Sequence, residues 1–305
     1  MRIRILSGNT LAVLCLLFSA GMWGLIWYPV RLLNEAGMPG IWSSLVMYLA
    51  AAIIVLPFLS NHYYEIIENK SALLVLAIAA GVTNVAFVVA LIEGEIMRVM
   101  LLFYLSPIWT VLLGRWWLGE RLSSKASFLF FIAMLGSLVM LWNPEIGLPW
   151  PHGIADALAL IAGVAFSVTN VLSRKLSSLT MTIKTAVIWW GVVGISLLVI
   201  AVQQSPLPEV TTITWASAWL LGWLGIVAMT VAVLYGVAMM PLYRSSVIML
   251  FELIVAAAAA WFLTDEAMTS QEWLGGGLIM LAAYGVATIE KPKNREILRK
   301  LGEKK

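Results

Sequence analysis

Ten stretches of about 20 mostly apolar residues follow one another along the 305-residue chain, and this succession limits its possible folds more than any other feature. An α-helix needs about 20 apolar residues to cross the ~30 Å hydrocarbon core of a bilayer. Hydrophobic residues make up 62% of the sequence and charged residues 11%, which leaves too little polar surface for ordinary water-soluble domains. We therefore predict an all-α membrane protein that forms a single membrane unit. The predicted helices are approximately Thr10–Val30, Ile41–Leu59, Ser71–Ile92, Met97–Leu118, Ala126–Trp142, Gly153–Leu172, Thr185–Val202, Trp215–Met239, Ser245–Thr264 and Glu272–Ile289.

Lys and Arg residues are distributed very unevenly between the two sides that ten alternating helices define. With the N-terminus placed inside, 17 of them fall on the inner side, and only Arg31 and Arg98 fall on the outer side. Cytoplasmic loops of membrane proteins carry such an excess of basic residues. We therefore expect both termini to be cytoplasmic. The N-terminal apolar stretch is interpreted as a retained first helix, because its hydrophobic pattern continues through Trp27.

Two stretches that lie 146 residues apart, Arg98–Met134 and Arg244–Met280, have the same layout. In each, an arginine opens a helix, a glutamate (Glu120 or Glu266) ends it, and a hydroxyl residue leads into the next helix. Few residues are identical between the two stretches, so the shared order of elements is the stronger signal. It indicates that the chain consists of two related halves.

Five helices in each half would make the second half enter the membrane upside down relative to the first. We predict a first repeat over residues 1–145, an inverted second repeat over residues 146–290 and a basic cytoplasmic tail over residues 291–305. Many secondary transporters use inverted repeats to open one central site to either side in turn, which is alternating access. A duplicated bundle that serves as a membrane binding or scaffold protein, without transport, is the alternative.

Other function classes have no support in the sequence. The single cysteine, Cys15, excludes an intramolecular disulfide, and neither a metal-ligand constellation nor a nucleotide-binding loop is present. The net charge of +3 comes from basic residues in loops and the tail, where it orients the protein in the membrane. We therefore expect no enzyme activity, no catalytic residues, no metal, no cofactor and no nucleic-acid partner.

The segments Tyr104–Ser123 and Phe251–Thr269, each followed by a helix rich in small residues, resemble the paired halves of the EamA family in the drug/metabolite transporter superfamily. The resemblance covers roughly residues 9–290. It implies a ten-helix carrier of the bacterial inner membrane, often an exporter of amino acids or related metabolites. It also implies that helices 1, 3, 4, 6, 8 and 9 surround a central cavity, with helices 5 and 10 at the periphery. One departure is Leu253, where second-half members commonly have a proline.

Glu252 is the most informative single residue. If its helix begins near Arg244, eight residues carry it roughly 12 Å into the membrane, close to the bilayer centre. A carboxylate there is costly unless it faces a wet cavity, has a partner or is protonated. We interpret it as a proton-coupling site or as a ligand for a cationic group on the substrate, the alternative being a neutral acid between helices. Its repeat partner is Ser106, beside Pro107, which can free a backbone carbonyl.

Further polar and aromatic residues fall inside the predicted helices. Each amide or hydroxyl there either joins two helices or faces the cavity, because the membrane interior offers no water. Tryptophans deep in the helices either stack on a planar substrate or pack in the core. The candidate substrate-binding residues are, together with Glu252 and Ser106, Tyr104, Trp109, Asn84, Asn170, Trp27 and Thr230.

Arg98 and Arg244 occupy matching helix starts on opposite sides of the predicted bundle. As gating residues they would bind a substrate carboxylate or pair with a nearby acid, and Glu95 lies three residues before Arg98. The alternative is that both arginines extend to the lipid headgroups, as arginines at helix ends do.

The sequence thus predicts a secondary transporter in a lipid bilayer that moves a small molecule, most simply an exporter of an amino acid or related compound. A carrier for a hydrophobic cation, nucleoside or vitamin stays open as an alternative, as does the scaffold. Protons are the candidate coupling ion, and both a monomer and a homodimer fit the sequence.

Overall fold

The computed structural model describes residues 8–142, 151, 153–263 and 268–288, and every regular element within these residues is helical. The predicted boundary between the repeats at residue 145, the residue Glu266 and the tail 291–305 lie outside the described residues. The helices are α1 (Gly8–Glu35), α2 (Gly40–Leu59), η1 (Ser60–His62), α3 (Tyr63–Glu68), α4 (Lys70–Glu93), α5 (Ile96–Phe103), α6 (Ser106–Leu118), α7 (Ser124–Leu141), α8 (Ile154–Lys175), α9 (Met181–Gln203), α10 (Thr212–Leu220), the π-helical turn η2 (Leu221–Ile226), α11 (Val227–Met239), α12 (Leu242–Met249), α13 (Phe251–Leu263) and α14 (Ser270–Ala287).

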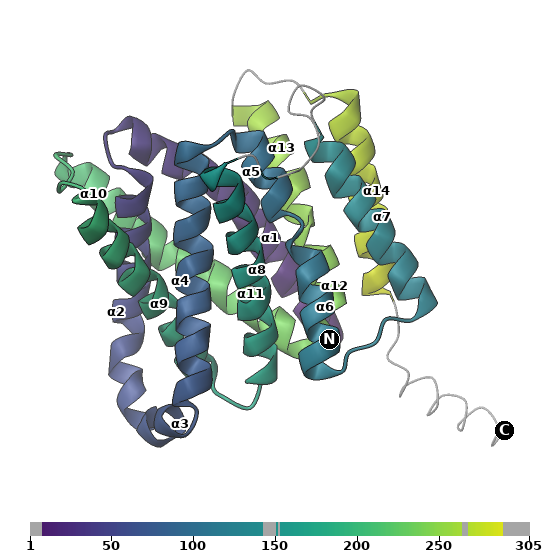
Figure 1. Cartoon of the computed structure of the whole chain (residues 1–305), viewed down its shortest axis with the longest axis horizontal. Helices are drawn as coiled ribbons and strands as arrows, with labels where there is room; N and C mark the ends of the chain where they lie inside the picture. Colours follow the sequence, from purple (N-terminus) through teal and green to yellow (C-terminus); the bar gives the residue numbers. More distant parts are fainter. Residues whose placement is uncertain (1–7, 143–150, 152, 264–267, 289–305) are drawn as a thin grey trace, which may run out of the picture.

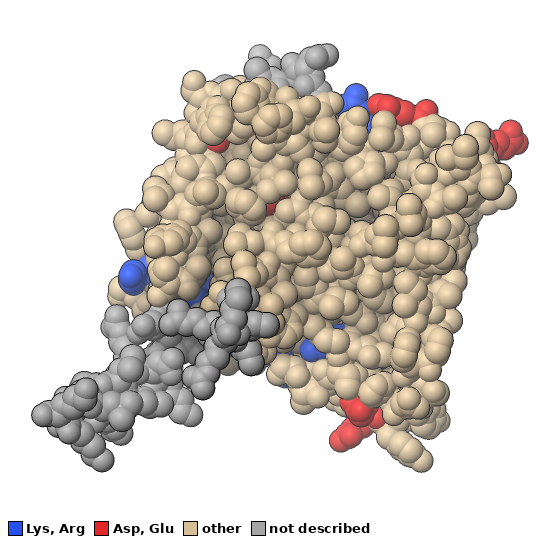
Figure 2. All heavy atoms as spheres, turned by 180° about the vertical axis from the view of Figure 1, so that it is seen from behind, with Lys and Arg blue, Asp and Glu red and all other residues tan. Residues whose placement is uncertain are grey.

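Nine helical spans within the described residues are long and apolar enough to cross a membrane. They correspond to the first nine predicted segments, and the tenth falls on α14, whose 18 residues pack along α7. Charged side chains gather toward the two ends of the molecule, and the belt between them is nearly uncharged (Figure 2). An all-α multi-pass membrane protein is therefore confirmed.

Two of the spans are broken near their middle. The fourth consists of α5 and α6, separated at Tyr104, and the ninth consists of α12 and α13, separated at Leu250. Pro107 accounts for the first break, because its ring removes the N–H that would continue the helical hydrogen bonding. The second break forms without a proline: the Leu253 N–H donates to the Leu250 carbonyl at 3.1 Å, a contact three residues back instead of four.

Small residues let several helices approach each other closely. A side chain added at Gly136 would lie 2.8 Å from the Gly275 carbonyl, which explains why α7 and α14 run side by side at one edge of the molecule (Figure 1). In the same way, a Cβ at Gly81 would lie 2.4 Å from the Gly191 carbonyl, between α4 and α9. Packing through glycine is typical of membrane helices, because no hydrophobic driving force joins them in lipid and close van der Waals contact contributes more.

The helix pairs that pack together correspond between the two halves. The pair α6 and α8 corresponds to α13 and α1, and the pair α4 and α8 corresponds to α11 and α1. The hydroxyl residues that lead into the last helix of each half are also confirmed as helix caps: Ser123 accepts a hydrogen bond at the start of α7, and Thr269 does so at the start of α14.

Candidate functional site

A central cavity of about 180 Å³ lies between the helices. Its walls come from α1, α2, α4, α8, α9 and α11 and from the two broken spans α5–α6 and α12–α13. Among the described residues, α7 and α14 contribute nothing to the lining. This agrees with the expected peripheral place of the fifth and tenth helices, and it adds α2 and α9 to the expected walls.

Most of the candidate binding residues meet at this cavity. The lining includes Glu252, Ser106, Tyr104, Asn84, Asn170 and Thr230. Their role in binding stays a prediction, but their convergence from five different spans is a property of the fold.

Trp27 and Trp109 are placed outside the cavity lining. Trp109 is 38% exposed, and its neighbours Ile108 and Leu112 are exposed as well, so this face of α6 points outward. Trp27 lies one helical turn beyond the cavity and packs edge to face against Tyr28, with ring centroids 5.6 Å apart. The tryptophan of α1 that lines the cavity is Trp23. These two placements correct the prediction that Trp27 and Trp109 lie at the cavity. The sequence alone did not determine the rotation of each helix about its axis, or the depth of each residue, to within one helical turn.

Glu252 is the only acidic or basic side chain among the described residues that line the cavity. It lies in the first turn of α13, where the helix dipole favours a negative charge, and the Tyr104 hydroxyl is its hydrogen-bonding neighbour. Glu252 and Tyr104 belong to the two broken spans, so this contact joins the two breaks across the cavity. An ionised Glu252 would make the cavity a site for one positive charge.

The helix breaks also release backbone carbonyls beside the cavity. Pro107 has no N–H to offer the Phe103 carbonyl, and Leu253 donates to Leu250 and not to Met249. Phe103 and Met249 are repeat partners, and both line the cavity. Unpaired carbonyls at a helix break are acceptors for cations or N–H groups, as in transporters with discontinuous helices.

The amide of Asn84 supplies a further acceptor. Its Nδ2 donates to the Tyr48 hydroxyl at 3.4 Å, while its Oδ1 is buried without a partner among the described residues. Thr230, by contrast, is already occupied, because its hydroxyl accepts from the Trp189 indole N–H at 3.1 Å. A buried amide oxygen without a donor is costly, so Asn84 is the better candidate for contact with a bound molecule.

Aromatic rings that the sequence analysis did not single out form much of one wall. The Phe103 ring lies 4.5 Å from that of Phe87 and 5.7 Å from that of Phe166, measured between centroids. All three line the cavity together with Tyr48. The sequence could have indicated Phe87, because it lies three residues after Asn84 and so shares the same helix face. No comparable signal existed for Phe103 and Phe166, whose contact depends on how α5 and α8 pack.

Arg98 forms an ion pair with Asp156, with the Arg98 Nε 2.6 Å from the Asp156 carboxylate. The arginine is 7% exposed and the aspartate 5%, so the pair joins the start of α5 to the first turn of α8 within the protein. Glu95, the partner considered from sequence, lies exposed just before α5. The idea that Arg98 extends to the headgroups is therefore wrong, because its charge is neutralised inside the bundle.

Arg244 is also buried, at 2% exposure. Its Nη2 donates to the Ala287 carbonyl at 2.9 Å, which ties the start of α12 to the end of α14. Its Nε has no partner among the described residues. Arg244 thus holds the fold together at this position and does not extend to the headgroups.

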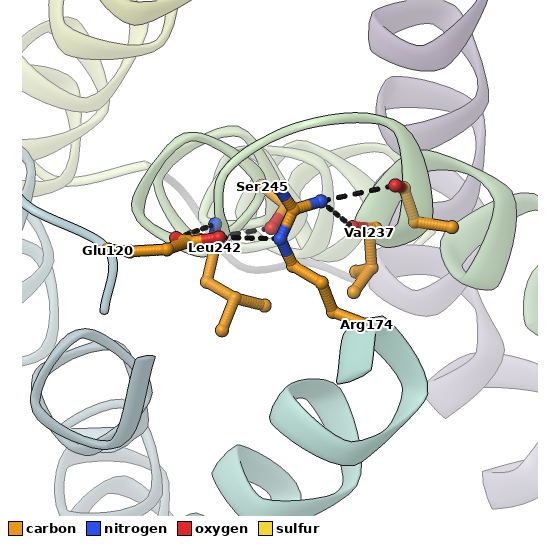
Figure 3. Close-up of polar contacts among 6 residues, drawn as sticks. Glu120, Arg174, Val237, Leu242 and Ser245 are labelled. Carbon is orange, nitrogen blue, oxygen red and sulfur yellow. Dashed lines mark hydrogen bonds and ion pairs between the residues drawn. The ribbon is translucent and has the colours of Figure 1, made fainter. Parts of the chain in front are cut away.

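A third arginine, Arg174, takes part in a polar contact that joins several helices (Figure 3). Its Nε donates to Glu120 at the end of the fourth span, and its Nη1 donates to the carbonyls of Val237 and Ala238 at 3.1 Å each. The second carboxylate oxygen of Glu120 accepts from the Leu242 N–H at 2.8 Å. Arg174 therefore caps the end of α11, and Glu120 caps the start of α12.

Comparison with known proteins agrees with this architecture. The family model described as "EamA-like transporter family" matches residues 10–142 and 153–288. No curated protein sequence matches the chain significantly. A solved crystal structure of a protein superposes with a TM-score of 0.72 over 91% of this chain and 96% of that chain, at 17% sequence identity, and this likeness concerns the fold.

Proposed function

Because the chain belongs to the EamA-like transporter family of the drug/metabolite transporter superfamily, it is a membrane transporter, and we propose that it exports an amino acid or a related small metabolite by alternating access. The observation that carries this proposal is the placement of Glu252. Among the described residues, one carboxyl group lies with aromatic side chains and unpaired carbonyls at the central cavity. This combination suits a solute with one ammonium group and an apolar or planar remainder.

The size of the cavity supports a small solute. Its 180 Å³ lies below the roughly 300–1,000 Å³ of pockets that hold drug-sized ligands. The ammonium group would contact Glu252, and it could share the carbonyls of Met249, three residues before Glu252, and of Phe103, next to Tyr104, since both residues line the same cavity. The Asn84 amide would contact the polar remainder, and the Phe87, Phe103 and Phe166 rings its apolar part.

Alternating access is supported by the correspondence between the halves. We propose ten membrane helices in two inverted repeats, residues 1–145 and 146–290, with a cytoplasmic tail over residues 291–305. The matching breaks at Tyr104 and Leu250 and the matching helix pairs are what such a repeat requires. The distribution of 17 inner and two outer basic residues supports cytoplasmic termini. The resemblance to carriers of the bacterial inner membrane supports that membrane as the location.

A hydrophobic organic cation is the second candidate substrate, and the aromatic wall favours it. Cations bind the faces of aromatic rings, and an unpaired carboxylate adds to that attraction. An amino acid differs because its own carboxylate also needs a donor. Competition between an amino acid and a quaternary ammonium compound for the same flux separates the two.

Counterflow in proteoliposomes tests the function directly. Vesicles are preloaded with an unlabelled amino acid, the labelled compound is added outside, and uptake is followed with and without a pH gradient. Saturable counterflow of at least one amino acid is expected. The absence of saturable flux with every amino acid and organic cation tried would favour the non-transporting scaffold.

Glu252→Gln separates the roles of the carboxyl group. The amide keeps the size and hydrogen bonding of the side chain but removes its charge and proton. We expect the pH gradient to lose its effect on flux and the apparent KM for an ammonium-bearing solute to rise about tenfold or more, as for loss of one charge-assisted contact. Glu95→Gln, which removes an exposed carboxyl group at the end of the bundle, is the matched control. Unchanged transport by Glu252→Gln at every pH would remove Glu252 from the mechanism.

A further inference from the structure

The amino end of α9 collects hydrogen-bond donors that have no acceptor among the described residues. Thr180 occupies the capping position, yet it accepts no hydrogen bond from the first turn, and its hydroxyl is buried without a partner in the part of the chain described. Thr211 and Thr269 occupy the same position before α10 and α14, and both act as caps. The first turn of α9 also has no acidic residue. Its free N–H groups and the positive end of the helix dipole are therefore uncompensated.

Lys184 adds a full positive charge at the same place. The sequence prediction put it in the loop before Thr185, but α9 begins four residues earlier, at Met181, and Lys184 is only 2% exposed. Within the described residues, its ammonium makes neither an ion pair nor a hydrogen bond. Side chains of a helix lean toward its amino end, so the Lys184 side chain is expected to lean back over the first turn of α9.

These groups share one unmet requirement. A lysine ammonium without a counter-charge, on a residue that is 2% exposed, a buried hydroxyl and the first N–H groups of a helix are each unfavourable without an acceptor. A single anion at the amino end of α9 would satisfy all of them. Helix amino ends with a basic side chain are common phosphate sites, because the N–H groups point at the phosphate oxygens. The preceding turn is open to solvent through Ser177 and Ser178, which gives such a group a way in.

We propose that the amino end of α9, with Thr180 and Lys184, binds a phosphate group. The group belongs to the headgroup of an anionic phospholipid or to inorganic phosphate. Neither residue lines the central cavity, so the site is separate from the solute pathway and does not depend on which solute is carried. Its position at the amino end of α9, after the turn that follows Lys175 at the end of α8, is one where basic residues between helices bind phospholipid headgroups.

Lipid retention by the full-length protein tests the proposal. Wild type and Lys184→Met are exchanged into mixed vesicles of phosphatidylcholine and phosphatidylglycerol, and the bound lipids are counted by native mass spectrometry. Lys175→Met, which removes an exposed lysine from the end of α8, is the control. We expect wild type and Lys175→Met to retain phosphatidylglycerol preferentially, and Lys184→Met to bind it about tenfold or more weakly.

A second arm separates the two sources of phosphate. Delipidated protein is titrated with inorganic phosphate, with chloride as the control anion, and thermal unfolding is recorded. Stabilisation of wild type but not of Lys184→Met by phosphate, without lipid preference, would assign the site to free phosphate. Thr180→Val provides a second variant if Lys184→Met does not fold, and it should weaken binding by a smaller factor. Equal retention of phosphatidylglycerol by wild type and Lys184→Met, together with equal responses to phosphate, would overturn the proposal.

Discussion

Removal of the Glu120 carboxylate should loosen four helices at once. The two oxygens of Glu120 accept from Arg174 at the end of α8 and from the Leu242 N–H at the start of α12. Arg174 in turn holds the last carbonyls of α11. Because α11 and α12 are separated by only two residues, this one ion pair caps both sides of the turn between them.

The magnitude follows from the number and burial of the contacts. A hydrogen bond to a charged group contributes about 1.5–3 kcal/mol, and Glu120 accepts two. The side chains of Glu120 and Arg174 are 16% and 24% exposed, so solvent screens part of the interaction, and we use the lower end of the range. Glu120→Ala should then cost about 3 kcal/mol, or roughly 5–10 °C in melting temperature. Glu120→Gln should cost about 1 kcal/mol, because its amide oxygen still accepts from Leu242.

The single cysteine of the chain provides a labelling site for measuring the unfolding of these variants. Cys15 is the only cysteine, so a thiol-reactive fluorophore follows unfolding of the purified protein in detergent at one position in α1. Arg121→Met, which removes an exposed charge next to Glu120, is the control and should melt like wild type. A double-mutant cycle with Arg174→Met should give a coupling energy of about 2 kcal/mol. Coupling below roughly 0.5 kcal/mol would refute the reasoning, since it would make the ion pair energetically neutral.

Two further substitutions test the packing by the same thermal assay. Asp156→Asn removes the carboxylate that neutralises the buried Arg98, and it should cost about 3 kcal/mol or more; a loss under about 1 kcal/mol would contradict a buried pair. Gly81→Ala places a methyl group 2.4 Å from a backbone carbonyl of α9 and should cost about 1–3 kcal/mol, while Gly194→Ala, with no atom within 4 Å, should stay within about 0.5 kcal/mol of wild type. Equal melting of the two alanine variants would show that α4 and α9 are not in tight contact.

The membrane class and the helix positions could be predicted because they depend on local patterns. Runs of apolar residues decide where a chain crosses the bilayer, and hydroxyl residues such as Ser123 mark helix starts wherever they occur. The place of Glu252 near the middle of the ninth span followed from counting residues along one helix. Trp109 could not be placed in this way, since an error of one residue turns a side chain by about 100° and moves it from the cavity to the lipid.

The break in the ninth span shows a second limit. A proline signals a break through its missing N–H, and Pro107 was therefore recognisable. Leu253 has an N–H, but that N–H shifts to the Leu250 carbonyl in the folded protein. Both breaks therefore release a backbone carbonyl. The Phe103 carbonyl is released because Pro107 has no N–H, and the Met249 carbonyl is released because packing shifts the Leu253 N–H to Leu250. Function can thus preserve a break while the sequence signal for it is lost.

Corresponding helix pairs in the two halves are held together by different forces. The span α5–α6 is joined to α8 at three levels: the ion pairs of Asp156 and Arg174 at its two ends, and the hydrogen bond from the Ser167 hydroxyl to the Ser106 carbonyl in the middle. The corresponding pair, α13 and α1, instead approaches through Gly24, where an added Cβ would lie 2.6 Å from the Glu252 carbonyl. Both arrangements fix two helices against each other, but they need different residue types. The two halves can therefore share an order of elements while few of their residues are identical.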